Sequence, residues 1–199
     1  MRLPNTCVVV LLALCLTALP ALGAAPTALV KSILDEVMAI QNNPALEGPA
    51  HEDARAQAIR RVIQKSFDFP AMAQESLGHA YGGLSSGQRQ EFSKVFSALF
   101  QASYTNLVLR FLKSETVKYG KETLKGNQAR VKTTLVRTND TIPVDYLLHE
   151  GGGRWLLYDV VVDGVSILEK YKNGFAREIQ ARSFQSLLKK MKTQLKAVQ

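Results

Sequence analysis

The sequence predicts an α+β fold, in which a twisted antiparallel sheet of about four strands carries N- and C-terminal helices packed on it. Apolar residues recur at helical spacing through about the first 110 positions. Between positions 116 and 162 the spacing changes to alternation, and after Gly164 it becomes helical again. Helices that cover one face of a curved sheet would enclose an apolar cavity.

The first predicted helices are set by local start and stop signals. One helix is expected over residues 27–41 and another over 52–66, because each has apolar residues on one face. Asp68 can cap a short third helix, with Pro70 in its first turn and Gly78 just past its end.

A long helix is predicted over about residues 86–112. Ser85 and Gln88 have the spacing of a capping box, which marks its start. The helix has one strongly aromatic, apolar face. This face comprises Phe92, Val95, Phe96, Leu99, Phe100, Tyr104, Leu107, Val108 and Phe111. Ordinary core packing explains at least part of the pattern.

Antiparallel strands are predicted next. Residues 116–119 form a short candidate, and residues 129–135 and 142–149 alternate between apolar and polar. Asn139-Asp140 lies between these two as a hairpin turn. Residues 155–162 are apolar on both faces, so this strand is expected to be central or covered on both sides.

Two helices should complete the domain after a turn at Asp163-Gly164. The first is expected over residues 166–181, and the second begins near Phe184. The second has a cationic outer side, formed by Lys189, Lys190, Lys192 and Lys196. A solvated helix face explains this cluster, although it could also meet anionic headgroups or an acidic partner.

Residues 1–23 have the pattern of a cleavable secretory signal peptide. Arg2 precedes an apolar run of about 13 residues, which is shorter than the roughly 20 residues that a spanning helix needs. Cleavage is expected before Ala24, which leaves residues 24–199 as a single domain. Both cysteines, Cys7 and Cys15, would leave with the signal. A secreted domain without disulfides is typical of the bacterial envelope, so we expect a periplasmic protein.

Motifs for catalysis are absent from the sequence. Its three histidines do not have zinc-site spacing, and no phosphate-binding loop or nucleophile elbow is present. His149 is expected to face outward into solvent. The net charge of +8 permits binding to anionic partners, but secretion argues against nucleic acid. We therefore predict a protein that is not an enzyme and needs no cofactor or metal.

Three segments resemble the MlaC family of periplasmic phospholipid-binding proteins, also described as toluene-tolerance auxiliary proteins. The clearest is WLLYDVVVDGVSILEKYKNGF, which starts at Trp155. The other two are FDFPAMAQESLG, from Phe67, and QRQEFSKVFSALFQASY, from Gln88. The three occur in the expected order over nearly the whole chain. One position departs, because Tyr81 stands where the family has tryptophan.

The resemblance implies a fold, a function and partners. Family members are soluble carriers that exchange phospholipid between an outer-membrane lipoprotein–porin complex and an inner-membrane ABC transporter with an MCE-domain protein. That exchange maintains outer-membrane lipid asymmetry. A related branch accompanies hopanoid lipids, which leaves a hopanoid carrier as an alternative.

A carrier needs a large apolar lining, which the long helix and the last strands can supply. The expected lipid-binding residues are Phe96, Leu99, Phe100, Tyr104, Val131, Val144, Tyr146, Leu157, Val160, Val165, Leu168, Tyr171 and Phe175. Two other classes remain open. An envelope assembly factor would bind protein in an exposed groove, and an enzyme would bring polar groups such as Asp159 and Tyr146 into the cavity.

Overall fold

The computed structural model describes residues 25–113 and 115–198. The signal peptide predicted for residues 1–23 lies outside this part of the chain. No helix within the described residues is long and apolar enough to cross a membrane.

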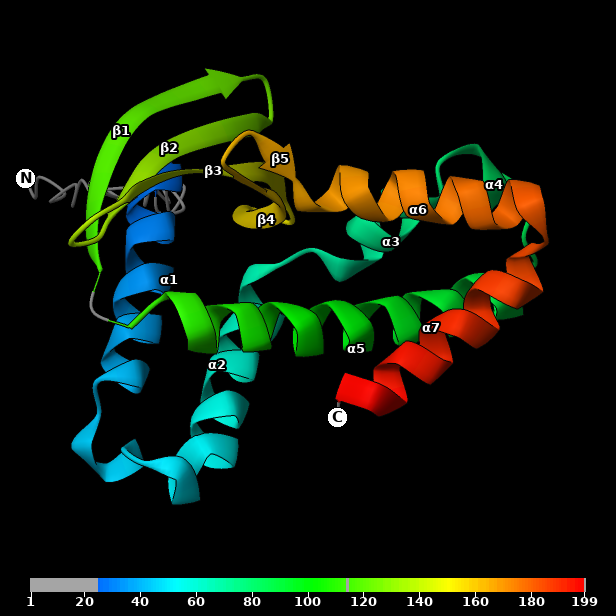
Figure 1. Ribbon diagram of the computed structural model, residues 1–199. Helices are drawn as coiled ribbons and strands as arrows, with labels where there is room; N and C mark the ends of the chain where they lie inside the picture. Colours follow the sequence, from blue (N-terminus) through cyan, green and yellow to red (C-terminus); the bar gives the residue numbers. More distant parts are fainter. Residues whose placement is uncertain (1–24, 114, 199) are drawn as a thin grey trace, which may run out of the picture.

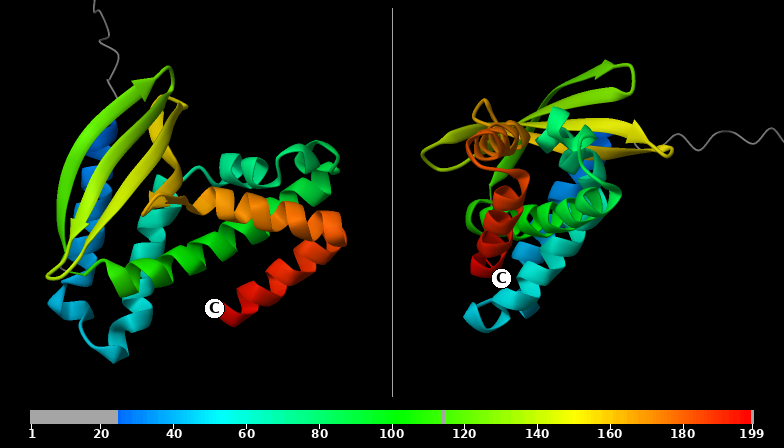
Figure 2. Two further views of the ribbon diagram at one scale, coloured as in Figure 1. Left: turned by 45° about the horizontal axis from the view of Figure 1, so that its top comes forward. Right: turned by 90° about the vertical axis from the view of Figure 1, so that its right-hand side faces the viewer.

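The chain forms a curved antiparallel sheet at one end and a helical layer that extends away from it (Figures 1 and 2). The helices are α1 (Pro26–Gln41), α2 (Glu52–Ser66), α3 (Phe69–Leu77), α4 (His79–Gly82), α5 (Ser86–Phe111), α6 (Ile167–Ala181) and α7 (Phe184–Val198). Two short 3₁₀ turns, Pro44–Leu46 and Pro49–His51, join α1 to α2. The long α5 reaches from beneath the sheet to the far end. The next helix, α6, runs from the sheet to the same far end, and α7 turns back from there along α5.

The predicted helix starts are confirmed by hydrogen bonds. Asp68 caps α3 by accepting from the amide of Ala71 at 3.0 Å. Ser85 and Gln88 form both bonds of the capping box that begins α5. These side chains occupy the free amides of each first turn, which is why both helices begin where the sequence indicates.

The sheet has the order β1-β2-β3-β4-β5, with every neighbour antiparallel. Its strands are β1 (Thr116–Lys125), β2 (Gln128–Val136), β3 (Thr141–Gly151), β4 (Arg154–Val162) and β5 (Val165–Ser166). The sheet therefore holds five strands rather than about four, because the two residues of β5 pair with the end of β4. The turn predicted at Asp163-Gly164 is present, with both residues at positive φ.

The strand β4 does not lie in the middle of the sheet, but its outer edge is covered. β5 meets only the last two residues of β4. Further along β4, Phe67 forms a bridge with Leu157, and the amide of Asp68 donates to the carbonyl of Leu157 at 2.8 Å. The segment before α3 thus pairs with the open edge of β4, which explains why this strand is apolar without lying in the middle.

A β-bulge changes which side chains of β4 face inward. Leu148 lies opposite Leu157, but Leu147 lies opposite Asp159, so Tyr158 is left without a partner. One extra residue reverses the alternation of a strand. Leu157 and Val160 consequently face the same side of the sheet, although an unbroken strand would point them to opposite sides.

The core of the helical layer is a row of aromatic rings along α5. Phe92, Phe96, Phe100 and Tyr104 follow one another with ring centroids 5.6–6.1 Å apart. Phe175 of α6 packs edge-on against Phe92. The aromatic face predicted for this helix is therefore largely core, and only its C-terminal part reaches the sheet.

Candidate functional site: an apolar cavity beneath the sheet

A cavity of about 270 Å³ lies between the inner face of the sheet and helices α1, α2 and α5. The helical lining consists of Ile33, Leu34, Val37, Val62, Ile63, Phe67, Tyr104, Leu107, Val108, Phe111 and Leu112, with Phe67 just after α2 and Leu112 just after α5. The sheet side consists of Leu135, Arg137, Ile142, Val144, Tyr146, Leu157, Val160 and Val162. All of these side chains are apolar or aromatic except Arg137. Such a lining favours a ligand that is mostly hydrocarbon.

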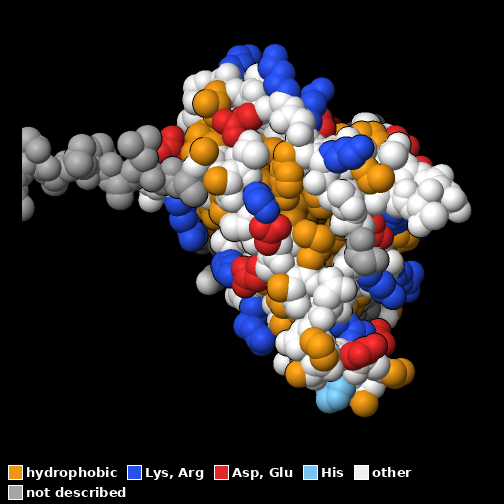
Figure 3. Space-filling model, turned by 90° about the vertical axis from the view of Figure 1, so that its left-hand side faces the viewer, with side chains coloured by type: hydrophobic (Ala, Val, Ile, Leu, Met, Phe, Trp, Pro, Cys, Tyr) orange, Lys and Arg blue, Asp and Glu red, His pale blue; other side chains and the backbone are white. Residues whose placement is uncertain are grey.

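The cavity has a closed floor and an open rim. Val62, Leu157 and Val160 form the floor and are almost completely buried. Leu107 and Phe111 lie one turn apart on α5 and are 40% and 48% exposed, so two large apolar side chains together reach the surface at this rim. Figure 3 views the side where α5 ends and the β2–β3 turn lies, and apolar side chains reach the surface there between charged ones.

The two hydroxyl groups of the lining stay neutral. Burial raises the pKa of both Tyr104 and Tyr146 well above the usual value for tyrosine. The cavity wall therefore carries no charge from these residues at neutral pH.

Five of the residues expected from the sequence line this cavity: Tyr104, Val144, Tyr146, Leu157 and Val160. Phe100 and Tyr171 line a second hollow of about 320 Å³ between α5 and the start of α6. The two hollows share Tyr104 and Leu107, so they adjoin each other.

The other expected residues lie away from the cavity. Phe96, Leu99 and Phe175 are buried in the helical core, and Val131 is buried on the inner face of the sheet. Leu168 lines a hollow on the opposite face of the sheet, and Val165 is half exposed in β5.

The sequence analysis missed the contribution of the first two helices. Ile33, Leu34 and Val37 of α1, with Val62 and Ile63 of α2, form much of the lining. Their helical periodicity was visible, but periodicity does not show whether an apolar face meets another helix, a sheet or an open cavity.

A larger hollow, about 730 Å³ and lined by both polar and apolar side chains, lies on the outer face of the sheet. Arg130, His149 and Tyr158 line it from the strands. His149 faces outward as predicted but is not simply solvated, because its Nε2 lies 2.9 Å from an oxygen of Asp68 and its ring stacks on Tyr158. This pair joins β3 to the start of α3, so it has a structural role in holding the sheet to the helical layer.

The two residues that an enzyme in this fold would use do not share a cavity. Tyr146 faces the apolar cavity, whereas the carboxylate of Asp159 lies toward the start of α6. There it accepts hydrogen bonds from the amides of Val160 and Leu168 and from the hydroxyl of Ser166. Asp159 therefore organises the junction between β4 and α6. The described residues also include no cluster of three His, Cys, Asp or Glu side chains suited to a metal ion.

Three comparisons with known proteins agree on one relationship. The family model described as MlaC protein matches residues 31–193. A protein of Haemophilus influenzae, named intermembrane phospholipid transport system binding protein MlaC, is 25% identical over 122 residues, which cover 58% of this chain and 56% of that protein. The alignment thus spans little more than half of the relative's length.

The fold also occurs in a solved structure. A phospholipid-binding protein from Ralstonia solanacearum, determined in complex with a phospholipid, superposes with a TM-score of 0.74 at 23% sequence identity. The match covers 86% of this chain and 97% of that protein. At this identity the likeness establishes the shared fold, whereas the family model covers most of the sequence itself. The chain belongs to the MlaC family.

Proposed function

We propose that this protein is a periplasmic carrier that holds the acyl chains of a phospholipid in the cavity between the sheet and α5. It would exchange this lipid between an outer-membrane lipoprotein–porin complex and an inner-membrane ABC transporter with an MCE-domain protein, and so maintain outer-membrane lipid asymmetry. The observation that carries the proposal is a cavity lined almost entirely by hydrocarbon and open at one rim.

The energetics of lipid transfer require such a cavity. Moving an acyl chain into water costs about 0.8 kcal/mol per methylene, so a chain of about 16 carbons costs on the order of 13 kcal/mol. A free lipid with two chains therefore cannot cross an aqueous gap at a useful rate. A protein that replaces water around the chains removes most of this barrier without any covalent step.

The size of the site suits a cavity that expands when it is filled. Its 270 Å³ is slightly below the range of about 300–1,000 Å³ typical of small-molecule pockets. The adjoining hollow between α5 and α6 adds about 320 Å³ across Tyr104 and Leu107. Tyr104 and Leu107 lie between the two hollows. Two acyl chains would occupy both hollows once these two side chains move away from the strands.

The names of the similar proteins support a binding role rather than catalysis. The Haemophilus protein is named as a binding protein of a phospholipid transport system, and the Ralstonia protein was solved with a phospholipid. A carrier without an energy source only equilibrates lipid between its partners, so the direction of transport would be set by those partners.

The proposal is tested by native mass spectrometry of the protein purified from a bacterial periplasm, with extraction and identification of any bound lipid. We expect one phospholipid per protein. Bound hopanoid would replace the proposed cargo. A protein that is bare and also refuses added lipid would overturn the carrier proposal in favour of an assembly factor.

A matched pair of variants localises the site. Leu107→Glu places a charge at the cavity rim and should abolish lipid retention. Leu124→Glu places the same charge on another exposed leucine, 58% accessible near the end of β1, and should retain lipid. Both positions tolerate a charge in the folded protein because both are exposed. Equal lipid content in the two variants would show that the rim is placed wrongly.

A further inference from the structure

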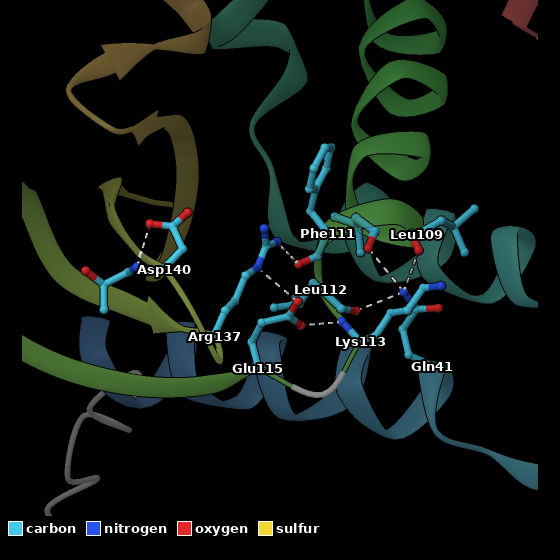
Figure 4. A network of polar contacts seen from close by, with 10 residues as sticks. Gln41, Leu109, Phe111, Leu112, Lys113, Glu115, Arg137 and Asp140 are labelled. Atoms are coloured by element: carbon cyan, nitrogen blue, oxygen red, sulfur yellow. Dashed lines mark hydrogen bonds and ion pairs between the residues drawn. The ribbon is translucent and has the colours of Figure 1, made fainter.

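Arg137 is the one charged side chain among the described residues that line the apolar cavity. It follows the last residue of β2, where the chain enters the β2–β3 turn (Figure 4). Its guanidinium lies over the ring of Phe111, 5.5 Å from the centroid, and therefore sits at the exposed rim. A charge beside an otherwise hydrocarbon cavity needs an explanation, because burying it without a partner is costly.

The guanidinium is held in place from two sides. Its Nη2 donates to the backbone carbonyl of Phe111 at 2.7 Å, and its Nε lies 3.2 Å from a carboxylate oxygen of Glu115. Glu115 is itself fixed, because its other oxygen accepts from the amide of Lys113 at 2.6 Å. Arg137 is thus anchored at the end of α5 rather than free to extend into solvent.

Much of the donor capacity of Arg137 is still unused. An arginine has five N–H donors. The contact with Glu115 is an ion pair without an aligned hydrogen bond, so in the described part of the chain only the bond to Phe111 is well directed. The side chain is 26% exposed although its Nε is buried, so the donors open to the rim belong to the two Nη nitrogens.

The position of Arg137 at the rim determines which part of a bound lipid its free donors would contact. When acyl chains fill an apolar cavity, the polar part of the lipid stays at the opening in contact with water. For a phospholipid, the first group beyond the glycerol is a phosphodiester, whose single negative charge is shared by two non-bridging oxygens. Guanidinium groups bind such oxygens through paired, charge-assisted hydrogen bonds.

We propose that Arg137 binds the phosphodiester of the lipid headgroup at the cavity rim, with Glu115 and the Phe111 carbonyl holding its guanidinium in position. This inference rests on the proposed carrier function and adds the residue that recognises the headgroup phosphate. It selects lipids that carry a phosphate over neutral lipids of the same chain length, and it makes a hopanoid, which has no phosphate at that place, a poor ligand.

The test compares two lipids with identical acyl chains, phosphatidylglycerol and diacylglycerol, by their dissociation constants for the delipidated protein. We expect the wild-type protein to prefer phosphatidylglycerol by about tenfold or more, since charge-assisted hydrogen bonds are among the strongest in proteins. Arg137→Gln should lose this preference, so that its dissociation constants for the two lipids become similar. Arg130→Gln is the matched control, because Arg130 is a half-exposed arginine on the opposite face of the sheet, and it should behave as wild type.

The outcomes separate this inference from the carrier proposal. A wild-type protein that binds both lipids equally, or an Arg137→Gln variant that keeps the preference, would overturn the role of Arg137 but leave the carrier. A wild-type protein that binds neither lipid would overturn both. Inorganic phosphate alone, titrated against the delipidated protein, should not bind measurably at Arg137, and saturation at millimolar concentration that Arg137→Gln abolishes would assign the residue to free phosphate instead.

Discussion

Filling the cavity from its floor should stabilise the protein and at the same time prevent it from binding lipid. Val160 lines the cavity from β4 and is almost completely buried. Val160→Phe would place a ring into the empty space. At about 24 cal/mol per Å³ of cavity, filling on the order of 50 Å³ lowers the free energy of the lipid-free state by roughly 1 kcal/mol. For a domain of this size that is a rise in melting temperature of about 2–4 °C.

A matched substitution distinguishes a residue of the cavity wall from a residue of the filled core. Val131 lies in the same row across the sheet, since Val131 pairs with Tyr146 and Tyr146 pairs with Val160. Val131 is fully buried but does not line the cavity. Val131→Phe should therefore overpack the core and cost about 1–3 kcal/mol.

The two variants are measured by thermal unfolding of delipidated protein and by binding of a fluorescent phospholipid. Val160→Phe should melt higher than wild type and bind lipid at least tenfold more weakly, whereas Val131→Phe should melt lower. If Val160→Phe destabilises the protein as much as Val131→Phe does, the space beneath β4 is packed and the reasoning about the cavity fails.

Four other expectations follow from single features. Gln41→Ala removes the side-chain amide that donates to the carbonyls of Val108 and Leu112, so it should loosen the end of α5 and speed lipid transfer to acceptor vesicles several-fold, whereas an unchanged rate would refute that role. Thr105→Val should raise the free energy of unfolding by about 1 kcal/mol in chemical denaturation, because the Thr105 hydroxyl is buried without a hydrogen-bond partner among the residues that the structure describes. Burial raises the pKa of Tyr146, so only the unfolded state loses this proton above about pH 10. Stability should consequently fall as the pH rises past 10, and less steeply in Tyr146→Phe. Amino-terminal sequencing of the periplasmic protein should read Ala24 first, and a retained Met1 would contradict the signal peptide.

The helices were predictable from the sequence because their determinants are local. A capping side chain and its amide lie three residues apart at Asp68 and at Ser85, so the start of α3 and of α5 can be read directly. The long α5 was placed to within one residue of its end.

The sheet was less predictable where its strands are irregular. The alternation of β1 is interrupted by a shift in register between Tyr119 and Glu122. Its lysines also obscure the alternation of apolar and polar residues in the rest of the strand, so only its first residues were predicted as a strand. The bulge at Tyr158 leaves no mark in the sequence, because it depends on how β3 pairs with β4. The sequence of β4 alone therefore could not show which of its side chains face the cavity.

The candidate site was only partly predictable for the same reason. The sequence indicated that apolar residues were abundant, but an apolar residue in a filled core and one in a cavity wall have the same pattern. Phe96 and Tyr104 belong to one stripe of α5, yet the first is core and the second lines both hollows. The difference arises because the sheet lies over only one part of that helix (Figure 2).

The way in which the cavity walls are fastened indicates where they open. The sheet wall is held by backbone ladders between β2, β3 and β4, and its edge is tied to the segment before α3 by the bond from Asp68 to Leu157. The end of α5, in contrast, is fastened to its surroundings by side chains, chiefly Gln41 and Arg137. Separating strands would break many backbone bonds together, whereas moving the end of α5 breaks only a few side-chain bonds, each worth about 1 kcal/mol net. Lipid should therefore enter past Leu107 and Phe111 by displacement of this helix end, and the residue proposed to bind the headgroup lies at the same place.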